Sequence, residues 1–247
     1  MKGGIIILDG YQNEFLFVLE FNNKKAKELN PLLREVIDDL FKDIDEDDII
    51  KSWRNHINNQ KGDIFIKIKN NVRSLSIKKG SQNSVHAESI DTVINYLRLL
   101  KVKESAIKKY LNYHYADNMN SKEYCDSHKE DINVLNKELN TIDIRHFINR
   151  FILKGRLSSY TVDGLIYGTP NDFFYINSKD ICKIITESKN RSSNSVHIGC
   201  LFVQPQNRCL NNNKKYIDKK DFIQIKWYSL FDDIIMYKAN KNIKKEL

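Results

Sequence analysis

The stretch Gly62–Gly80, with the sequence GDIFIKIKNNVRSLSIKKG, has the period-two pattern of a β-hairpin. Apolar side chains occupy alternate positions on both sides of Asn70 and Asn71. Asparagine tolerates the positive φ angles of a type I′ turn, so these two residues are the expected turn. Pairing counted outward from that turn places Asp63 directly opposite Lys78, on the same side of the sheet. The sequence therefore predicts that a carboxylate and an ammonium group converge at the open end of a hairpin.

This pair of groups suits phosphodiester hydrolysis. A carboxylate such as that of Asp63 binds Mg²⁺, which prefers oxygen ligands and keeps several of its waters. The bound ion polarises a phosphoryl oxygen and lowers the pKa of a water ligand. The ammonium group of Lys78 can orient that water or stabilise the charge that develops on phosphorus. The alternative is an ordinary cross-strand ion pair on a solvated face, worth about 0.2–1 kcal/mol, and the hairpin alone does not decide between the two.

A magnesium site of this kind calls for a second carboxylate. The chain leaves the hairpin at Gly80, and a helix predicted over Glu88–Leu100 would carry Glu88 in its first turn, over the strand end. Asp91 is a weaker substitute, and Glu35, on a helix predicted upstream of the hairpin, is a further candidate ligand. The alternatives are an acid that complements the helix dipole for Glu88 and a solvated helix face for Glu35.

Further polar side chains are candidates for contacts with nucleic acid. Asn83 and His86 follow the hairpin and would contact phosphate or the attacking water, although a loop that caps a helix needs no function. Gln224 and Lys226 share one face of a strand predicted over Phe222–Trp227, where they suit phosphate and base contacts, and the alternative is a solvated sheet face. The candidate DNA-binding side chains are Ser76, Asn83, His86, Arg208, Gln224 and Lys226.

In the hairpin the chain resembles the PD-(D/E)xK nuclease superfamily, which includes many restriction endonucleases. The family pattern is an Asp on one strand and (Asp/Glu)-x-Lys on the next, and the matching residues are Asp63 and Ser76, Ile77 and Lys78. Gly62 stands where the family often has Pro, and Ser76 stands where the second acid is expected.

Some branches of this superfamily share the Ser-x-Lys form and use a Glu from the following helix in the metal site, and Glu88 resembles that acid. The family core also has a helix before the Asp strand that often carries a Glu, and Glu35 resembles that position. The resemblance covers about residues 30–105. It implies catalytic roles for Asp63, Lys78 and Glu88, and a Mg²⁺ site formed by Asp63, Glu88 and Glu35.

The same resemblance implies an α/β fold, with a restriction-endonuclease-like mixed sheet flanked by helices. One nuclease-like domain would span residues 1–247, with its core at about 30–105 and 158–240 and a helical insertion at about 102–155. The implied function is Mg²⁺-dependent hydrolysis of double-stranded DNA by a type II restriction or phage-defence endonuclease. Enzymes of this kind usually act as homodimers, so a homodimer is the expected assembly.

Composition and charge agree with a nucleic-acid partner. The chain has 247 residues and a formal net charge of +8, which favours polyanions. It lacks the GxxxxGK[ST], GxGxxG and GxSxG motifs, and its four cysteines do not have zinc-site spacing. No apolar run approaches the ~20 residues of a membrane span, so a cytoplasmic protein is expected.

Two other functions stay open at this point. The missing acid at Ser76 favours a catalytically inactive nucleic-acid-binding protein with a nuclease-like fold. A structural or interaction protein, in which Asp63 and Lys78 form only an ion pair, is the third reading.

Periodicity and turn signals predict the other elements. The expected strands are Ile5–Leu8 and Glu14–Phe21, as a hairpin over residues 4–21, and Thr161–Tyr167, Phe173–Ile176 and Val196–Gln204. The expected helices are Pro31–Lys42, Glu46–Asn58, Glu104–Tyr115, one or two within Asp131–Lys154, Ser178–Glu187 and Leu230–Tyr237.

Overall fold

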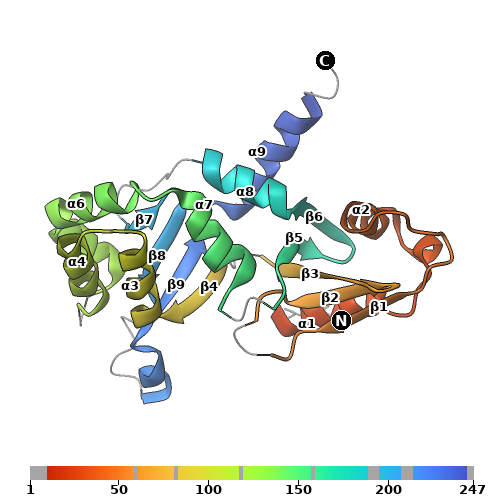
Figure 1. Cartoon of the computed structure of the whole chain (residues 1–247), viewed down its shortest axis with the longest axis horizontal. Helices are drawn as coiled ribbons and strands as arrows, with labels where there is room; N and C mark the ends of the chain where they lie inside the picture. The colour runs from red at the N-terminus through yellow and green to blue at the C-terminus, as the bar shows by residue number, and fades with distance from the viewer. Residues whose placement is uncertain are drawn as a thin grey trace, which may run out of the picture. The chain divides into compact units, whose positions relative to one another are not determined.

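The computed structural model describes residues 10–57, 60–80, 83–116, 119–156, 159–188, 195–206 and 214–243. The chain forms two compact units, each with its own sheet (Figure 1). Unit 1 comprises Met1–Gln82 and Asn149–Lys183, and unit 2 comprises Asn83–Ile148 and Ile184–Leu247. Unit 2 therefore begins directly after the predicted hairpin, well before the insertion that the sequence predicts at about 102–155.

Unit 1 is built on a mixed five-stranded sheet in the order β1-β2-β3-β5-β6. Strands β3 and β5 run parallel, and the other neighbours are antiparallel, as an α/β fold with a mixed sheet requires. The strands are β1 (Ile50–Arg54), β2 (Ile64–Ile68), β3 (Asn71–Lys78), β5 (Val162–Thr169) and β6 (Asp172–Asn177).

Helices α1 (Gly10–Phe21) and α2 (Pro31–Leu40) pack into one apolar core with this sheet. Helix α2 begins where the sequence predicts, because the Asn30 side chain accepts a hydrogen bond from the amide of Leu33. The core residues shared by these helices and the sheet include Phe17, Val18, Phe21, Leu33, Val36, Ile37, Ile64, Ile66, Ile68, Leu75 and Ile77.

Two predictions in the first quarter of the chain are wrong. The second strand of the hairpin predicted over residues 4–21 is part of helix α1, while Ile5–Leu8 lies outside the described residues. Its aromatic and β-branched residues favour a strand, but burial of Asn13, Phe17 and Phe21 at four-residue steps stabilises a helix. The helix predicted over Glu46–Asn58 is strand β1, in which buried and outward-facing residues alternate.

The central hairpin is confirmed, with a shift in its register. Ile68 pairs with Asn71, so the turn residues are Lys69 and Asn70, and Lys69 has a φ of +53°. The Lys69 ammonium lies 3.0 Å from Asp45, an ion pair that helps to hold this residue in the left-handed region. Because the shift is two residues, every side chain stays on its predicted face.

Unit 2 contains an antiparallel sheet in the order β4-β9-β8-β7, and Figure 1 shows helices α3, α4 and α6 gathered beside it. Its strands are β4 (Ser84–Ser89), β9 (Phe222–Trp227), β8 (Leu201–Pro205) and β7 (His197–Ile198). Its helices include α3 (Ile90–Leu99), α4 (Glu104–His114), α5 (Ser121–Ser127), α6 (Lys129–Leu139), α7 (Ile144–Phe147) and α9 (Leu230–Ile243).

Two segments run across the boundary between the units in sequence. They are a π-helical stretch, Ile148–Lys154, and helix α8 (Ser178–Glu187), which the sequence predicts at these bounds. Within the part of the chain that the structure describes, no helix has the length and hydropathy needed to cross a membrane.

Candidate active site

Asp63 lies directly before β2, at the open end of the central hairpin. Its backbone amide donates to the Leu75 carbonyl at 2.8 Å, and its carbonyl accepts from the Asn55 amide at 3.0 Å. Gly62, directly before it, has a φ of +90°. Proline cannot adopt this angle, so the Pro that the PD-(D/E)xK pattern often has before its Asp would not fit this backbone.

One carboxylate oxygen of Asp63 is held by three donors from β3. Asp63 Oδ2 accepts from the Ile77 amide at 2.6 Å, from Ser76 Oγ at 3.0 Å and from Lys78 Nζ at 3.4 Å. The predicted convergence of carboxylate and ammonium is thus present, although Asp63 lies just beyond the last pair of the ladder, Ile64 with Leu75, and is not paired with Lys78. The Lys78 side chain is only 17% exposed, so it adds a partly desolvated positive charge beside the carboxylate.

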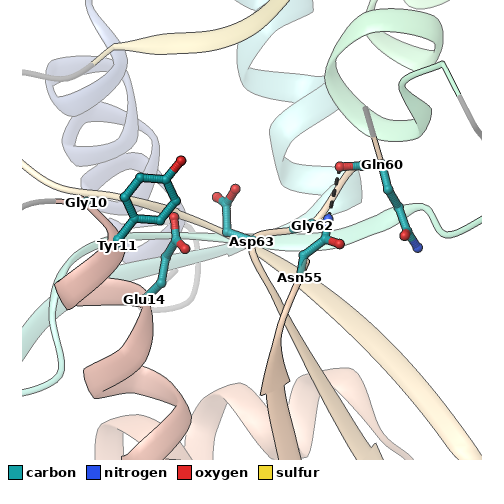
Figure 2. Close-up of a pocket in the computed structure, with 7 residues that line it drawn as sticks. All are labelled: Gly10, Tyr11, Glu14, Asn55, Gln60, Gly62 and Asp63. Carbon is teal, nitrogen blue, oxygen red and sulfur yellow. Dashed lines mark hydrogen bonds between the residues drawn. The ribbon is translucent and has the colours of Figure 1, made fainter. Parts of the chain in front are cut away.

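Helix α1 supplies a second carboxylate to the same place. Glu14 and Asp63 line one pocket of about 540 Å³, and Figure 2 shows their carboxylates directed into the same space. The other lining residues are Gly10, Tyr11, Asn55, Gln60 and Gly62. All of them belong to unit 1.

The electrostatics of Glu14 show that the two acids interact. Burial raises the pKa of Glu14 above its usual value, and the charge of Asp63 raises it further. Arg54 and Lys78 act in the opposite direction, and the Arg54 guanidinium lies 3.2 Å from Glu14 Oε2. A cation between the carboxylates would relieve the repulsion that the pKa records.

Each acid also keeps one oxygen for a ligand. Glu14 Oε2 is held by Arg54 and Asp63 Oδ2 by β3, whereas Glu14 Oε1 and Asp63 Oδ1 accept no hydrogen bond from any described residue. In the described ranges, no group of three or more His, Cys, Asp or Glu side chains could hold a metal ion. The metal ligands that this pocket can provide are therefore the two carboxylates of Glu14 and Asp63.

Asn55 shapes the wall of the pocket on the side away from α1. Its side-chain amide donates to the Gly62 carbonyl at 2.8 Å and to the Gln60 carbonyl at 3.1 Å, the second bond being drawn in Figure 2. These bonds tie the connection between β1 and β2 to the residue before Asp63. The position of the carboxylate is thereby fixed from both sides, by β3 and by this connection.

We expect Gly62→Ala to displace Asp63 and to destabilise the protein by about 2–5 kcal/mol. A Cβ at Gly62 would lie 2.8 Å from the Ser74 Cβ, and the positive φ adds about 1–2 kcal/mol of strain for an L-residue. Ser74 cannot easily yield, because its hydroxyl donates to the Thr161 carbonyl and its amide to Asp163. Denaturant unfolding would measure the loss.

Gly80→Ala is the matched control for this substitution. Gly80 also has a positive φ, +62°, but nothing lies within 4 Å of a Cβ built there. Only the backbone strain of about 1–2 kcal/mol should appear. Equal losses at the two glycines would contradict the steric explanation for Gly62.

Several predicted site residues lie elsewhere. Glu35 is exposed on α2 and is not among the residues that line the pocket. Glu88 is not in the first turn of a helix, as predicted, because Ser89 caps α3 and Glu88 belongs to strand β4 of unit 2. It is buried there, 4% exposed, with the His86 ring 3.4 Å from its carboxylate. Its role as a metal ligand stays a prediction.

Of the remaining candidates for DNA contacts, His86 lies on β4, Gln224 and Lys226 lie on β9, and Asn83 directly precedes β4. Asn83 donates to the Tyr228 carbonyl at 3.3 Å, and Gln224 donates to the Ser84 hydroxyl at 2.9 Å. Gln224 and Lys226 share a face of β9, as predicted, because the alternate residues of that strand are buried. Arg208 lies outside the described residues, and Ser76 is engaged with Asp63.

Glu14 is the residue that the sequence interpretation missed. The strand predicted over Glu14–Phe21 hid it, because a strand in that place would not present an acid to the hairpin. The four-residue spacing of Asn13, Phe17 and Phe21 was the available signal, since it is typical of a helix, and Glu14 lies within that helix directly after Asn13. Glu14 and Glu35 both lie on helices that precede β2, and among the described residues only Glu14 of the two lines the pocket of Asp63.

Comparison with known proteins adds no identification. No protein-family model matches the chain, and no curated protein is significantly similar to it. The geometry of the pocket of Glu14 and Asp63 is therefore the main evidence for a function.

Proposed function

We propose that the protein is a Mg²⁺-dependent endonuclease that hydrolyses DNA phosphodiester bonds at the pocket of Glu14 and Asp63. The observation that carries this proposal is the convergence of two carboxylates from different elements, with the Lys78 ammonium on one of them. A structural ion pair explains Asp63 and Lys78, but it does not explain why α1 brings a second acid whose pKa Asp63 raises.

The residues present fit Mg²⁺. This ion is usually bound by one or two carboxylates, and it completes its octahedron with waters and substrate phosphate oxygens. Glu14 Oε1 and Asp63 Oδ1 are the two oxygens without a donor among the described residues, so both are suited to ligate the ion. When bound there, the ion would lower the pKa of a ligand water and polarise the scissile phosphate.

The protein's own groups would position the reacting water and hold the charge. Lys78 Nζ lies at the edge of the carboxylate pair, where it can orient the water that attacks phosphorus and stabilise the added negative charge on the phosphoryl oxygens. Attack would form a bond from the water oxygen to phosphorus while the bond to the leaving deoxyribose oxygen breaks; the attacking water would lose a proton to solvent, and the leaving oxygen would take one up from solvent. Ser76 and the Ile77 amide keep Asp63 in place through Oδ2 while this occurs.

DNA as substrate rests on charge and on the resemblance to PD-(D/E)xK nucleases. The net charge of +8 favours a polyanion, and two cations contact the acids of the pocket, Arg54 beside Glu14 and Lys78 beside Asp63. A restriction or phage-defence role, duplex DNA and a homodimer are implied by the resemblance and belong to this proposal.

A catalytically inactive DNA-binding protein is the second candidate. Ser76 stands where the family has an acid, and its hydroxyl is used to hold Asp63. If Glu14 does not replace that acid in function, the chain would bind DNA without cutting it.

One experiment separates the two candidates. Supercoiled plasmid DNA is incubated with the protein in Mg²⁺ and in EDTA, and Asp63→Asn is assayed beside the unmodified chain. We expect nicked and linear DNA only with Mg²⁺ and only with Asp63 present. Cleavage that persists in EDTA or in Asp63→Asn would overturn the mechanism, and binding without cleavage would select the inactive protein.

A further inference from the structure

The sheet of unit 1 continues from the pocket as a face that carries aromatic rings and lysines. Because side chains alternate along a strand, Phe65 and Lys67 of β2 point to the same side, about 6.6 Å apart, and Asp63 of the pocket directly precedes this strand. On β1, Trp53 pairs with Phe65 and Lys51 pairs with Lys67, so they share that side. We call this surface, formed by Trp53, Phe65, Lys51, Lys67 and the adjacent Tyr160, the Phe65 face.

Two exposed rings cover one buried ring on this face. Phe65 is 3% exposed, because the Trp53 ring stacks on it at 5.7 Å between centroids and the Tyr160 ring lies at 4.8 Å. Trp53 and Tyr160 themselves are 39% and 41% exposed. Phe65 thus fixes the two outer rings in place while part of each ring surface remains open to solvent.

The lysines beyond the rings form a like-charge pair. Lys51 and Lys67 are directly opposite each other, which is an unfavourable cross-strand arrangement in the absence of an anion. Lys51 Nζ donates to Asn23 Oδ1 at 2.5 Å, and Lys67 has no acidic partner within the described ranges. A phosphate near this pair would remove the repulsion.

We propose that the Phe65 face binds an unpaired stretch of DNA strand that continues from the scissile phosphate. Exposed Trp and Tyr rings stack on bases, and a base can offer its ring face only when it is outside a duplex. The lysine pair, about 13 Å along the strand from Asp63, contacts the phosphates of the same stretch. This inference rests on the proposed nuclease function and names the substrate of the same site as DNA that is single-stranded beside the cut.

A second copy of the chain or an apolar protein segment would fit this face less well. The rings are bordered by two cations at one end and by the carboxylates at the other, so the apolar part is small. Continuity with the pocket that would take the phosphate, together with the charge of the lysine pair, favours a polyanion with stackable rings.

The test measures binding without cleavage. Fluorescence anisotropy in EDTA compares one labelled oligonucleotide as a single strand, as a full duplex and as a duplex with a central unpaired bubble. We expect the single strand and the bubble to bind about tenfold or more tightly than the duplex. Trp53→Ala should weaken single-strand binding about tenfold, because stacking contributes about 1–3 kcal/mol per base, and Trp53→Phe should restore most of it.

Matched controls exclude general effects. Phe15→Ala removes another exposed aromatic ring of unit 1, on α1, and should leave binding unchanged. Lys67→Ala should lower the slope of log affinity against log salt by about 1, whereas Lys108→Ala, on α4 of unit 2, should not. Far-UV circular dichroism and the thermal midpoint would verify that Trp53→Ala folds. If it does not fold, the comparison of Trp53→Phe with the unmodified chain tests the inference.

The outcomes keep this inference apart from the proposed function. Equal affinity for duplex and single strand, or equal binding by Trp53→Ala, Trp53→Phe and Phe15→Ala, would overturn the inference even if plasmid DNA is cleaved. If the protein prefers single strands and Trp53→Ala abolishes this preference, the inference is supported even when no DNA is cleaved. Only the nuclease proposal would then fail.

Discussion

Lys78→Ala is expected to lower the rate of Mg²⁺-dependent plasmid cleavage by about 10²–10³-fold, which is the usual loss when one donor to a developing oxyanion is removed. The Lys78 ammonium lies 3.4 Å from Asp63 Oδ2 and is mostly buried, so its charge acts in a partly desolvated place. The carboxylate keeps its other two donors, Ser76 Oγ and the Ile77 amide, in the variant. Initial rates at saturating Mg²⁺ would measure the loss.

Lys79→Ala is the control for charge. It removes one positive charge at the next residue, beyond the end of β3, and should change the rate by no more than a few fold. DNA affinity in EDTA should be similar for both variants, because a single cation contributes little to a surface with a net charge of +8. If Lys78→Ala and the unmodified chain cleave at the same rate, Asp63 and Lys78 form only a structural ion pair, and Lys78 has no catalytic role.

The hairpin was predictable because its strands follow a simple alternation over many residues. The register was not, since the type I′ preference of two asparagines competes with a turn in which Lys69 takes positive φ and pairs with Asp45. The error had no effect on the site, because a shift of two residues keeps Asp63, Ser76 and Lys78 on one face.

The second acid, Glu14, was harder to predict, because the four-residue spacing in its segment competes with residues that favour a strand. The α1 segment contains residues that favour strands, and only its packing against the sheet decides for a helix. The start of α3 depends on one cap, Ser89, and moving that start by two residues takes Glu88 out of the helix and into β4. These local sequence signals are weaker than the tertiary contacts that determine α1 and the start of α3. The hairpin residues of the site, Asp63 and Lys78, were therefore predicted from the sequence, and the helix residue Glu14 was not.

Glu14→Gln is expected to cleave poorly without loss of stability. Burial and Asp63 raise the pKa of Glu14 in the folded protein, so folding takes up protons there and stability falls as pH rises through the window between the unfolded and folded pKa values. Once ionised, Glu14 therefore opposes folding in the absence of metal. The variant should unfold at an equal or higher denaturant concentration than the unmodified chain at pH 7, and the difference should shrink at acidic pH. A marked loss of stability in Glu14→Gln would contradict this account.

The choice between Glu14 and Glu88 as the second acid is decided by comparing Glu14→Gln with Glu88→Gln in cleavage assays over a range of Mg²⁺ concentrations. Glu14→Gln should lower the rate about a hundredfold or more, about 2.7 kcal/mol in the barrier, and shift the Mg²⁺ dependence to higher concentration. The reason is that Glu14 Oε1 is a free carboxylate oxygen in the pocket of Asp63.

Glu88→Gln should stay within a few fold of the unmodified chain, because its carboxylate is buried beside His86 on β4. Unfolding curves for both variants would show that each is folded under the assay conditions. If Glu88→Gln abolishes cleavage and Glu14→Gln does not, the metal site would use the acid that the Ser-x-Lys resemblance implies, and the pocket of α1 would lose its assigned role.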